Sequence, residues 1–147
     1  LDPAPAEHIP EELYKHCTYI TPNETEANAL LGLQINNVHD ASKAAEEFLY
    51  RGAETAIIKM GSNGAYFASR SKSGHVPAFD VVARDTVAAG DAFNAGLAVA
   101  LSENKPLDVA VQWGCATGAL SVTKLGAQDA MPSRNQVEEL IKNSQHI

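Results

Sequence analysis

Residues 84–101 join a loop of small and polar residues, RDTVAAGD, to a long apolar run, AFNAGLAVAL. The segment Asp91–Leu101 is apolar on nearly every side, which predicts a buried helix that other elements must cover. Upstream, the apolar segment 55–60 predicts a strand, the sequence GSNG a turn, and residues 65–69 a returning strand. We therefore expect an α/β fold in which a largely parallel sheet is flanked by helices.

Other elements follow from helical spacing and from capping and turn residues. Residues 1–6 read as the end of a strand that enters a proline-rich loop. The predicted helices cover 10–15, 23–31 ended by Gly32, 41–51 capped by Asp40 and closed by Gly52, about 106–123, and a last helix whose capping box pairs Ser133 with Gln136. A short strand at 17–20, an exposed turn at 71–74 and extended segments at 75–76 and 79–83 complete the prediction.

Length and composition limit the function classes. A chain of 147 residues with 45% hydrophobic residues predicts one globular domain. Its net charge of −7 argues against a nucleic-acid-binding protein. We expect no membrane association, since no apolar run approaches about 20 residues. Cys17 and Cys115 form neither a disulfide framework nor a metal motif, which favours a cytoplasmic setting.

Asp91 lies where the loop becomes a helix. A helix start presents unpaired backbone N–H groups, and the small residues Ala88, Ala89 and Gly90 let an anion approach them. An acid beside such a site suits phosphoryl transfer, with the acid taking a proton from an attacking hydroxyl. An aspartate at this position can equally be a helix cap. From the local chemistry alone, both roles stay open.

The stretch DTVAAGD closely resembles the Asp-Thr-x-x-Ala-Gly-Asp motif of the PfkB carbohydrate kinases, in the form with Ala-Ala that ribokinases carry. The resemblance implies that Asp91 is the general base on a sugar hydroxyl. It also implies that the backbone N–H groups of Ala88, Ala89 and Gly90 form an anion hole.

Two earlier segments have local readings as a helix cap and a β-turn. The first, TPNETEA, resembles the Asn-x-x-Glu motif of the same family, which implies that Asn23 helps to hold phosphates and that Glu26 positions Mg²⁺ through water. The second, KMGSNG, is similar to a family loop that borders ATP. That likeness implies nucleotide contacts from four residues: Lys59, Gly61, Ser62 and Gly64.

A third segment, KLGAQDA at 124–130, reads locally as a loop. In ribokinases the corresponding loop supports a monovalent cation, usually K⁺. The resemblance implies ligands from the Asp85 side chain and from the carbonyl groups of Val87, Ser121, Lys124 and Gly126. Two positions depart from the family pattern: Ala130 replaces a serine of the cation shell, and Cys115 stands beside the expected adenine site in place of histidine or asparagine.

The resemblance extends from residue 1 to about residue 141 and implies a ribokinase-like fold. It predicts that residues 1–147 are the nucleotide-binding, C-terminal part, without the sugar-binding half and its β lid. The implied reaction converts ATP and D-ribose to ADP and ribose 5-phosphate, with Mg²⁺ and K⁺. Without neighbouring strands, we expect an uncovered sheet edge and self-association or a partner. A non-catalytic nucleotide-binding or structural fragment, and a fructokinase or nucleoside kinase relative, remain alternatives.

Overall fold

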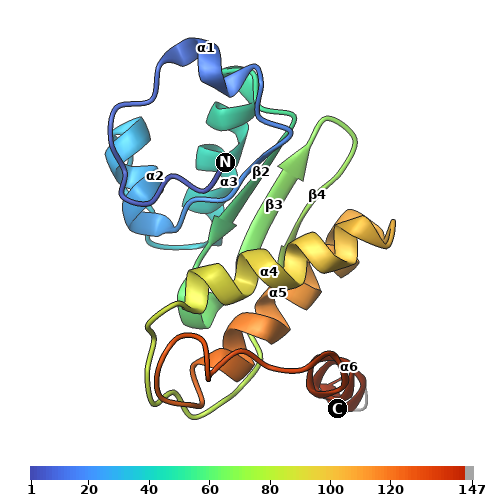
Figure 1. Ribbon diagram of the computed structural model, residues 1–147. Coiled ribbons are helices and arrows are strands. Elements are labelled where there is room, and N and C mark those ends of the chain that lie inside the picture. Colours follow the sequence, from blue (N-terminus) through green and yellow to red (C-terminus); the bar gives the residue numbers. More distant parts are fainter. Residues whose placement is uncertain (145–147) are drawn as a thin grey trace. The chain divides into compact units, whose positions relative to one another are not determined.

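A computed structural model describes residues 1–144, which divide into two compact units, Leu1–His75 and the residues from Val76 on (Figure 1). The first unit holds a four-stranded sheet with helices, and the described part of the second holds three helices. The α/β prediction is confirmed. That residues 1–147 act as a single domain stays a prediction.

The elements of the first unit follow the predicted order closely. They are α1 (Glu11–Tyr14), β1 (Tyr19–Ile20), α2 (Glu24–Leu31), α3 (Val38–Tyr50), β2 (Thr55–Lys59), the 3-10 helix η1 (Gly61–Asn63), β3 (Ala65–Ser69) and β4 (Ser73–Val76). β4 begins within the segment predicted as a turn at 71–74. Residues 77–88 contain neither helix nor strand, so the predicted extended segment at 79–83 does not join the sheet.

The sheet has the order β1-β2-β3-β4. β1 pairs with β2 in parallel, and β2 pairs with β3 antiparallel with Ile57 opposite Phe67. The sheet is therefore mixed rather than largely parallel, because the short turn after β2 returns the chain as a hairpin. Leu1 accepts from the Thr21 N–H group at 3.0 Å, and its own nitrogen donates to the Tyr19 carbonyl at 2.7 Å, which is the pattern of a strand end beside β1.

Helix α3 supplies much of the core of the first unit. Ala41, Ala44, Ala45 and Phe48 lie at helical spacing and are fully buried, and all five positions of β2 are buried. The Phe48 ring lies 6.0 Å from that of Tyr14. Figure 1 shows α3 running along the sheet. The apolar face of this helix is thus the one that packs inward.

The start of α3 differs from the prediction. Its N-cap is Asn37, whose Oδ1 accepts from the Asp40 N–H group at 2.9 Å. Asp40 lies at the third helical position and accepts from the Asn36 N–H group at 3.1 Å. Asp40 is therefore not the cap. It lies in the first turn, where its Oδ2 also accepts from Asn37 Nδ2 at 2.9 Å, and the helix starts three residues earlier than predicted.

The second unit contains α4 (Ala89–Ser102), α5 (Leu107–Ser121) and α6 (Arg134–Ser144). The expectation that 91–101 is buried on all sides is wrong for one face. Phe93 and Leu97 are buried, whereas Asp91, Ala95 and Val99 are exposed. The segment is apolar in composition because it contains many alanines, and their small side chains can stay exposed to solvent.

Helices α4 and α5 lie side by side (Figure 1), and glycine sets how closely they approach. A Cβ atom at Gly96 would lie 2.2 Å from Thr117 Oγ1 and 2.7 Å from the Trp113 carbonyl oxygen. Thr117 Oγ1 itself donates to that carbonyl at 2.7 Å. Helices α4 and α5 therefore pack too closely at this point for any residue other than glycine at position 96.

A charged cluster connects the ends of the three helices. Trp113 is buried, and its ring centroid lies 5.0 Å from Lys105 Nζ and 5.3 Å from Arg134 Cζ. Arg134 donates to both carboxylate oxygens of Glu103, with Nη2 at 3.0 Å from Oε2. Arg134 and, secondarily, Lys105 lower the pKa of Glu103 to about 2. Both cations thus face an aromatic ring and share one carboxylate.

The predicted capping box of α6 is confirmed, because the Gln136 carboxamide oxygen accepts from the Ser133 N–H group at 2.9 Å. His8, His16, His39 and His75 are exposed, while His146 lies outside the described residues. Within residues 1–144, no helix has the length and apolar character needed to cross a membrane.

Candidate functional site

The carboxylate of Asp85 joins two loops of the second unit. Its Oδ1 accepts from the Val87 N–H group and its Oδ2 from the Gly126 N–H group, each at 3.0 Å. These two hydrogen bonds lower the pKa of Asp85. The N–H groups of Arg84 and Asp85 donate to the Val122 carbonyl at 2.7 and 3.2 Å. The loop before α4 and the loop after α5 are thus held together.

The backbone at Ala88 prepares the start of α4. Ala88 has φ 60°, a left-handed conformation, and takes the N-cap position without a side-chain cap. Its carbonyl accepts the first helical hydrogen bond from Ala92 at 2.9 Å. The Ala89 N–H group donates to the Thr86 carbonyl at 3.2 Å, whereas the N–H groups of Ala88 and Gly90 have no partner among residues 1–144. One of the three predicted anion-hole donors, the Ala89 N–H group, is therefore already bonded within the turn.

Asp91 is the third residue of α4 and is exposed. The capping alternative fails, because Ala88 is the N-cap and no side chain caps this helix. In the part of the chain that the structure describes, the Asp91 carboxylate has no hydrogen-bond or ion-pair partner. It is thus a free carboxylate in the first turn, where the helix dipole favours negative charge.

Asn23 and Glu26 cap α2. Asn23 Oδ1 accepts from the Glu26 N–H group, and Glu26 Oε2 accepts from the Asn23 N–H group, each at 2.8 Å. The local reading of this segment as a helix cap is therefore confirmed. Each side chain keeps unused groups among the described residues: the carboxamide nitrogen of Asn23 and the Oε1 oxygen of Glu26.

Lys59 ends β2 and is held by an acid that the sequence analysis did not identify. Its Nζ lies 2.8 Å from Asp2 Oδ1, which also accepts from Thr21 Oγ1 at 3.1 Å. Lys59 is only 9% exposed. An ion pair between residues 57 positions apart leaves no local signal, although a buried lysine at a strand end implies a nearby acid. A parallel bridge between Asn23 and Lys59 places the two predicted nucleotide residues side by side.

The segment 61–64 forms η1 and its C-terminal turn. Gly64 has φ 85° and ψ −132°, a conformation that essentially only glycine adopts. Ser62 and Asn63 are exposed. His75 Nε2 lies 2.6 Å from the Asn63 carbonyl oxygen. The two residues are 12 positions apart, so no local sequence pattern indicates this contact.

The remaining predicted residues differ in environment. Lys124 is exposed, and Ser121 is buried, with its Oγ donating to the Gly118 carbonyl at 2.8 Å. Ala130 is 1% exposed. Burial raises the pKa of the Cys115 thiol to about 12, so it remains protonated. Across residues 1–144, no three His, Cys, Asp or Glu side chains gather so as to hold a metal ion.

Within each unit, the structure brings predicted site residues together. In the first unit these are Asn23, Glu26 and Lys59. In the second they are Asp85, Val87 and Gly126, with Ala88–Asp91 following along the same loop. The roles assigned to these residues stay predictions.

Comparison with known proteins identifies relatives of nearly the whole chain. The ribokinase of Haemophilus influenzae is 42% identical over 144 residues, 98% of this chain and 47% of that protein. The crystal structure of a Thermotoga maritima ribokinase matches with a TM-score of 0.86 and 44% identity, covering 97% of this chain and 48% of that one. A structure of Arabidopsis thaliana ribokinase complexed with ribose and ATP matches with a TM-score of 0.85 and 31% identity, covering 91% and 44%.

The chain thus spans about half the length of these relatives. The sequence profile described as pfkB family carbohydrate kinase matches residues 1–134. Since that match extends over most of the sequence, the chain belongs to the pfkB family of carbohydrate kinases.

Proposed function

We propose that this chain provides the ATP-binding and proton-accepting part of a ribokinase reaction. In this reaction the γ-phosphoryl group of ATP passes to the primary hydroxyl of D-ribose, which yields ribose 5-phosphate and ADP. The observation that carries the proposal is the unpaired, exposed carboxylate of Asp91 in the first turn of α4. Family membership and the ribokinase relatives support it.

Asp91 serves as the general base that accepts the proton of the attacking hydroxyl. No hydrogen bond within the described chain competes for its carboxylate. The unpaired N–H groups of Ala88 and Gly90 lie one to three residues before it and stabilise charge on the transferred group. Phosphoryl transfer depends mainly on such positioning and charge stabilisation.

Mg²⁺ fits the first unit as an ion held through its water shell. Mg²⁺ keeps several waters and binds few protein oxygens directly. Glu26 has one carboxylate oxygen outside the capping box, and Asn23 has its carboxamide nitrogen. In this proposal Glu26 would hold the ion through its water shell, and Asn23 would donate to a phosphate oxygen. When bound with ATP, the ion neutralises phosphate charge.

The first unit also supplies the nucleotide loop. Gly61, Ser62 and Gly64 border ATP, and Lys59 holds positive charge at the end of the neighbouring strand. The Asp2 carboxylate balances that positive charge through its ion pair while no phosphate is bound. From the second unit, the buried and protonated thiol of Cys115 is proposed to border the adenine.

K⁺ is proposed at the paired loops of the second unit. The carbonyl oxygens of Val87, Lys124 and Gly126 accept no hydrogen bond among residues 1–144, so they are available as ligands. Asp85 holds the loops in place through two backbone N–H groups. The Ser121 carbonyl already accepts from the Lys124 N–H group at 3.3 Å, and Ala130 adds no side-chain oxygen.

The sugar side of the reaction is proposed to come from residues equivalent to the remaining half of the relatives. We also propose that self-association or a partner covers the open edge of the sheet. We expect residues 1–147 alone to bind ATP and to turn over ribose very slowly, because the residues that position the sugar are proposed to lie outside this segment.

The direct test is ADP release by the purified chain with ATP, Mg²⁺, K⁺ and D-ribose. Asp91→Asn is expected to reduce any ribose-dependent turnover about 10²- to 10⁴-fold, the usual contribution of a general base. Glu139→Gln, an exposed acid on α6, is the matched control and should leave turnover unchanged. Turnover that survives in Asp91→Asn refutes the role of Asp91.

ATP binding by calorimetry separates the alternatives. Binding without turnover is the outcome for a nucleotide half that needs its sugar half, and the absence of both favours a structural fragment. Asn23→Ser sharpens the test, because serine keeps an N-cap but removes the carboxamide. We expect weaker MgATP binding with the thermal stability retained. If the affinity is unchanged, Asn23 is only a cap.

A further inference from the structure

The loop 61–64 is closed by hydrogen bonds of its own. The Asn63 N–H group donates to the Met60 carbonyl at 2.9 Å, and the Gly64 N–H group to the Gly61 carbonyl at 3.1 Å. The Met60 N–H group donates to the Gly64 carbonyl at 2.8 Å. These bonds shape the loop, but all of them lie between residues 60 and 64.

One bond connects this loop to another strand. His75 Nε2, on β4, lies 2.6 Å from the carbonyl oxygen of Asn63. A carbonyl oxygen has no hydrogen to give, so the imidazole must donate. The ring therefore carries its hydrogen on Nε2, in the neutral tautomer or in the imidazolium. Among the described residues, no other hydrogen bond reaches the Asn63 carbonyl.

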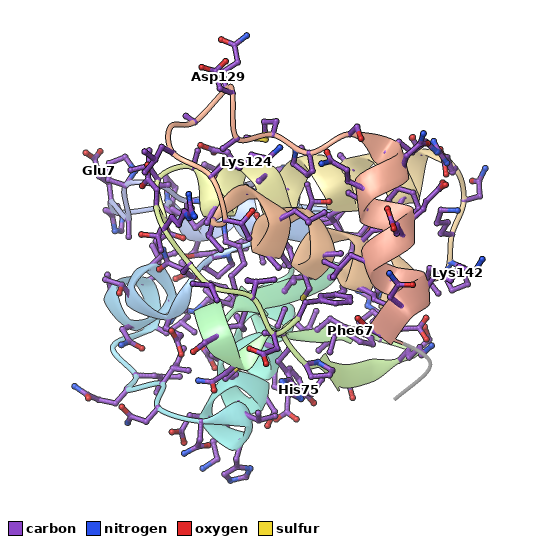
Figure 2. All side chains as sticks on the ribbon, turned by 90° about the horizontal axis from the view of Figure 1, so that it is seen from below. Glu7, Phe67, His75, Lys124, Asp129 and Lys142 are labelled. Atoms are coloured by element: carbon purple, nitrogen blue, oxygen red, sulfur yellow. The ribbon has the colours of Figure 1, made fainter. Side chains whose placement is uncertain are left out.

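The strand that carries His75 is anchored next to that residue. A Cβ atom at Gly74 would lie 3.2 Å from Cε1 and Cζ of Phe67, so the Phe67 ring packs directly over the Gly74 backbone. Phe67 is 2% exposed and belongs to β3, where it pairs with Ile57. Figure 2 labels Phe67 and His75 on these adjacent strands. A buried ring thus fixes the backbone one residue before the donor.

From this geometry we infer that His75 is a positioning residue that holds the nucleotide loop 61–64 in its ATP-binding conformation. The inference rests on the proposed function for its ligand. His75 reaches the loop at the peptide between Asn63 and Gly64. Rotation of that peptide would change the backbone angles of Gly64, whose conformation essentially only glycine adopts. The path of the chain around the nucleotide would change with it. In this inference His75 acts on the loop through the Asn63 carbonyl and not by contact with ATP.

The test compares three variants of the 147-residue chain. His75→Ala removes the donor. His75→Gln also removes the ring but places an amide nitrogen at about the position of Nε2, so it isolates the hydrogen bond from the loss of the ring. His39→Ala is the matched control, since His39 is exposed on α3 and its ring has no hydrogen bond among residues 1–144.

The first readout is amide hydrogen exchange of Asn63 and Gly64 by NMR, without ATP. We expect exchange to be about 2- to 10-fold faster in His75→Ala, the factor that one hydrogen bond contributes, and near the wild-type rate in His75→Gln and His39→Ala. The second readout is the MgATP dissociation constant, which should rise by a similar factor in His75→Ala only.

The readouts separate two failures. If the wild-type chain does not bind MgATP, the proposed function fails, while the exchange rates still test whether His75 holds the loop. Unchanged exchange in His75→Ala overturns the positioning role. Faster exchange with an unchanged dissociation constant overturns the link between the loop and the nucleotide. A loss in His75→Ala that His75→Gln does not restore also overturns the inference, because the ring and not the hydrogen bond would be responsible.

Discussion

Replacement of Gly96 by alanine should destabilise the second unit, although alanine is the better helix former. Gly96 lies within α4 and faces α5. Alanine gains about 1 kcal/mol over glycine in a helix interior. Its methyl group, however, would lie 2.2 Å from Thr117 Oγ1, 2.8 Å from Thr117 Cβ and 2.7 Å from the Trp113 carbonyl oxygen. These distances are far below van der Waals contact.

No small rearrangement of the structure removes these clashes without a loss of stability. Rotation of the Thr117 hydroxyl breaks its 2.7 Å hydrogen bond to the Trp113 carbonyl, which costs about 1 kcal/mol. The Trp113 carbonyl belongs to the α5 backbone, so the helices must also separate, and such overpacking costs about 1–3 kcal/mol. After the gain in helix propensity, we expect a net loss of about 1–3 kcal/mol in the free energy of unfolding. The melting temperature should fall by about 2–12 °C.

Thermal and urea unfolding followed by far-ultraviolet circular dichroism measure this loss. Gly118→Ala is the matched control in the same interface, because its Cβ atom would lie 3.3 Å from the Ala89 carbonyl oxygen. We expect that variant to stay within about 1 kcal/mol of wild type, since the gain in propensity offsets a mild contact. Adding Thr117→Ala to Gly96→Ala should recover part of the loss but not the part due to the Trp113 carbonyl.

A Gly96→Ala variant that is as stable as Gly118→Ala would contradict this prediction. In that case the two helices separate without cost, and their close approach contributes nothing to stability. Equal destabilisation by both variants would also count against it, because the two sites differ by more than 1 Å in their nearest contact.

Two further predictions concern charged groups of the second unit. Arg134→Gln should raise the pKa of Glu103 from about 2 toward its ordinary value of 4.5, since Arg134 is the main cause of the shift; carboxyl NMR titration measures it. Because the folded-state pKa is lowered, the stabilisation from Glu103 is present above pH 4.5 and lost as the pH falls toward 2, and the variant should lack most of this loss. Asp85→Ala should make the Val87 and Gly126 amides exchange several-fold faster, with Asp85→Asn intermediate, and unchanged exchange would show that Asp85 does not join the loops.

Features that depend on neighbouring residues were predictable from the sequence. The capping boxes at Asn23–Glu26 and Ser133–Gln136 and the end of α2 at Gly32 depend on side chains within four positions of the helix end. The hairpin after β2 follows from two glycines between apolar segments. The start of α3 was misplaced because Asn37 and Asp40 are both good capping residues, and only the folded backbone decides between them.

Long-range contacts have no local pattern in the sequence. The Asp2–Lys59 ion pair joins residues 57 positions apart and was not predicted. The Asp85–Gly126 hydrogen bond spans 41 positions, and only the family resemblance placed these two residues at one site. The start of α4 has no signal of the usual kind, because Ala88 caps it by a left-handed backbone and not by a side chain. For Asp91, local chemistry left capping and catalysis open. The structure excludes capping, because Ala88 is the N-cap of α4, and the catalytic role depends on membership of the family.

The packing of Lys105 and Arg134 on Trp113 also bears on how the protein can be observed. Trp113 is the sole tryptophan of the sequence and lies in the second unit, whereas all four tyrosines, Tyr14, Tyr19, Tyr50 and Tyr66, lie in the first. Each unit therefore carries its own class of fluorophore. Selective excitation of the indole reports on α4–α6 alone, and its emission should respond when the two cations leave the ring. The wild-type chain can thus indicate, without any label, which unit unfolds first.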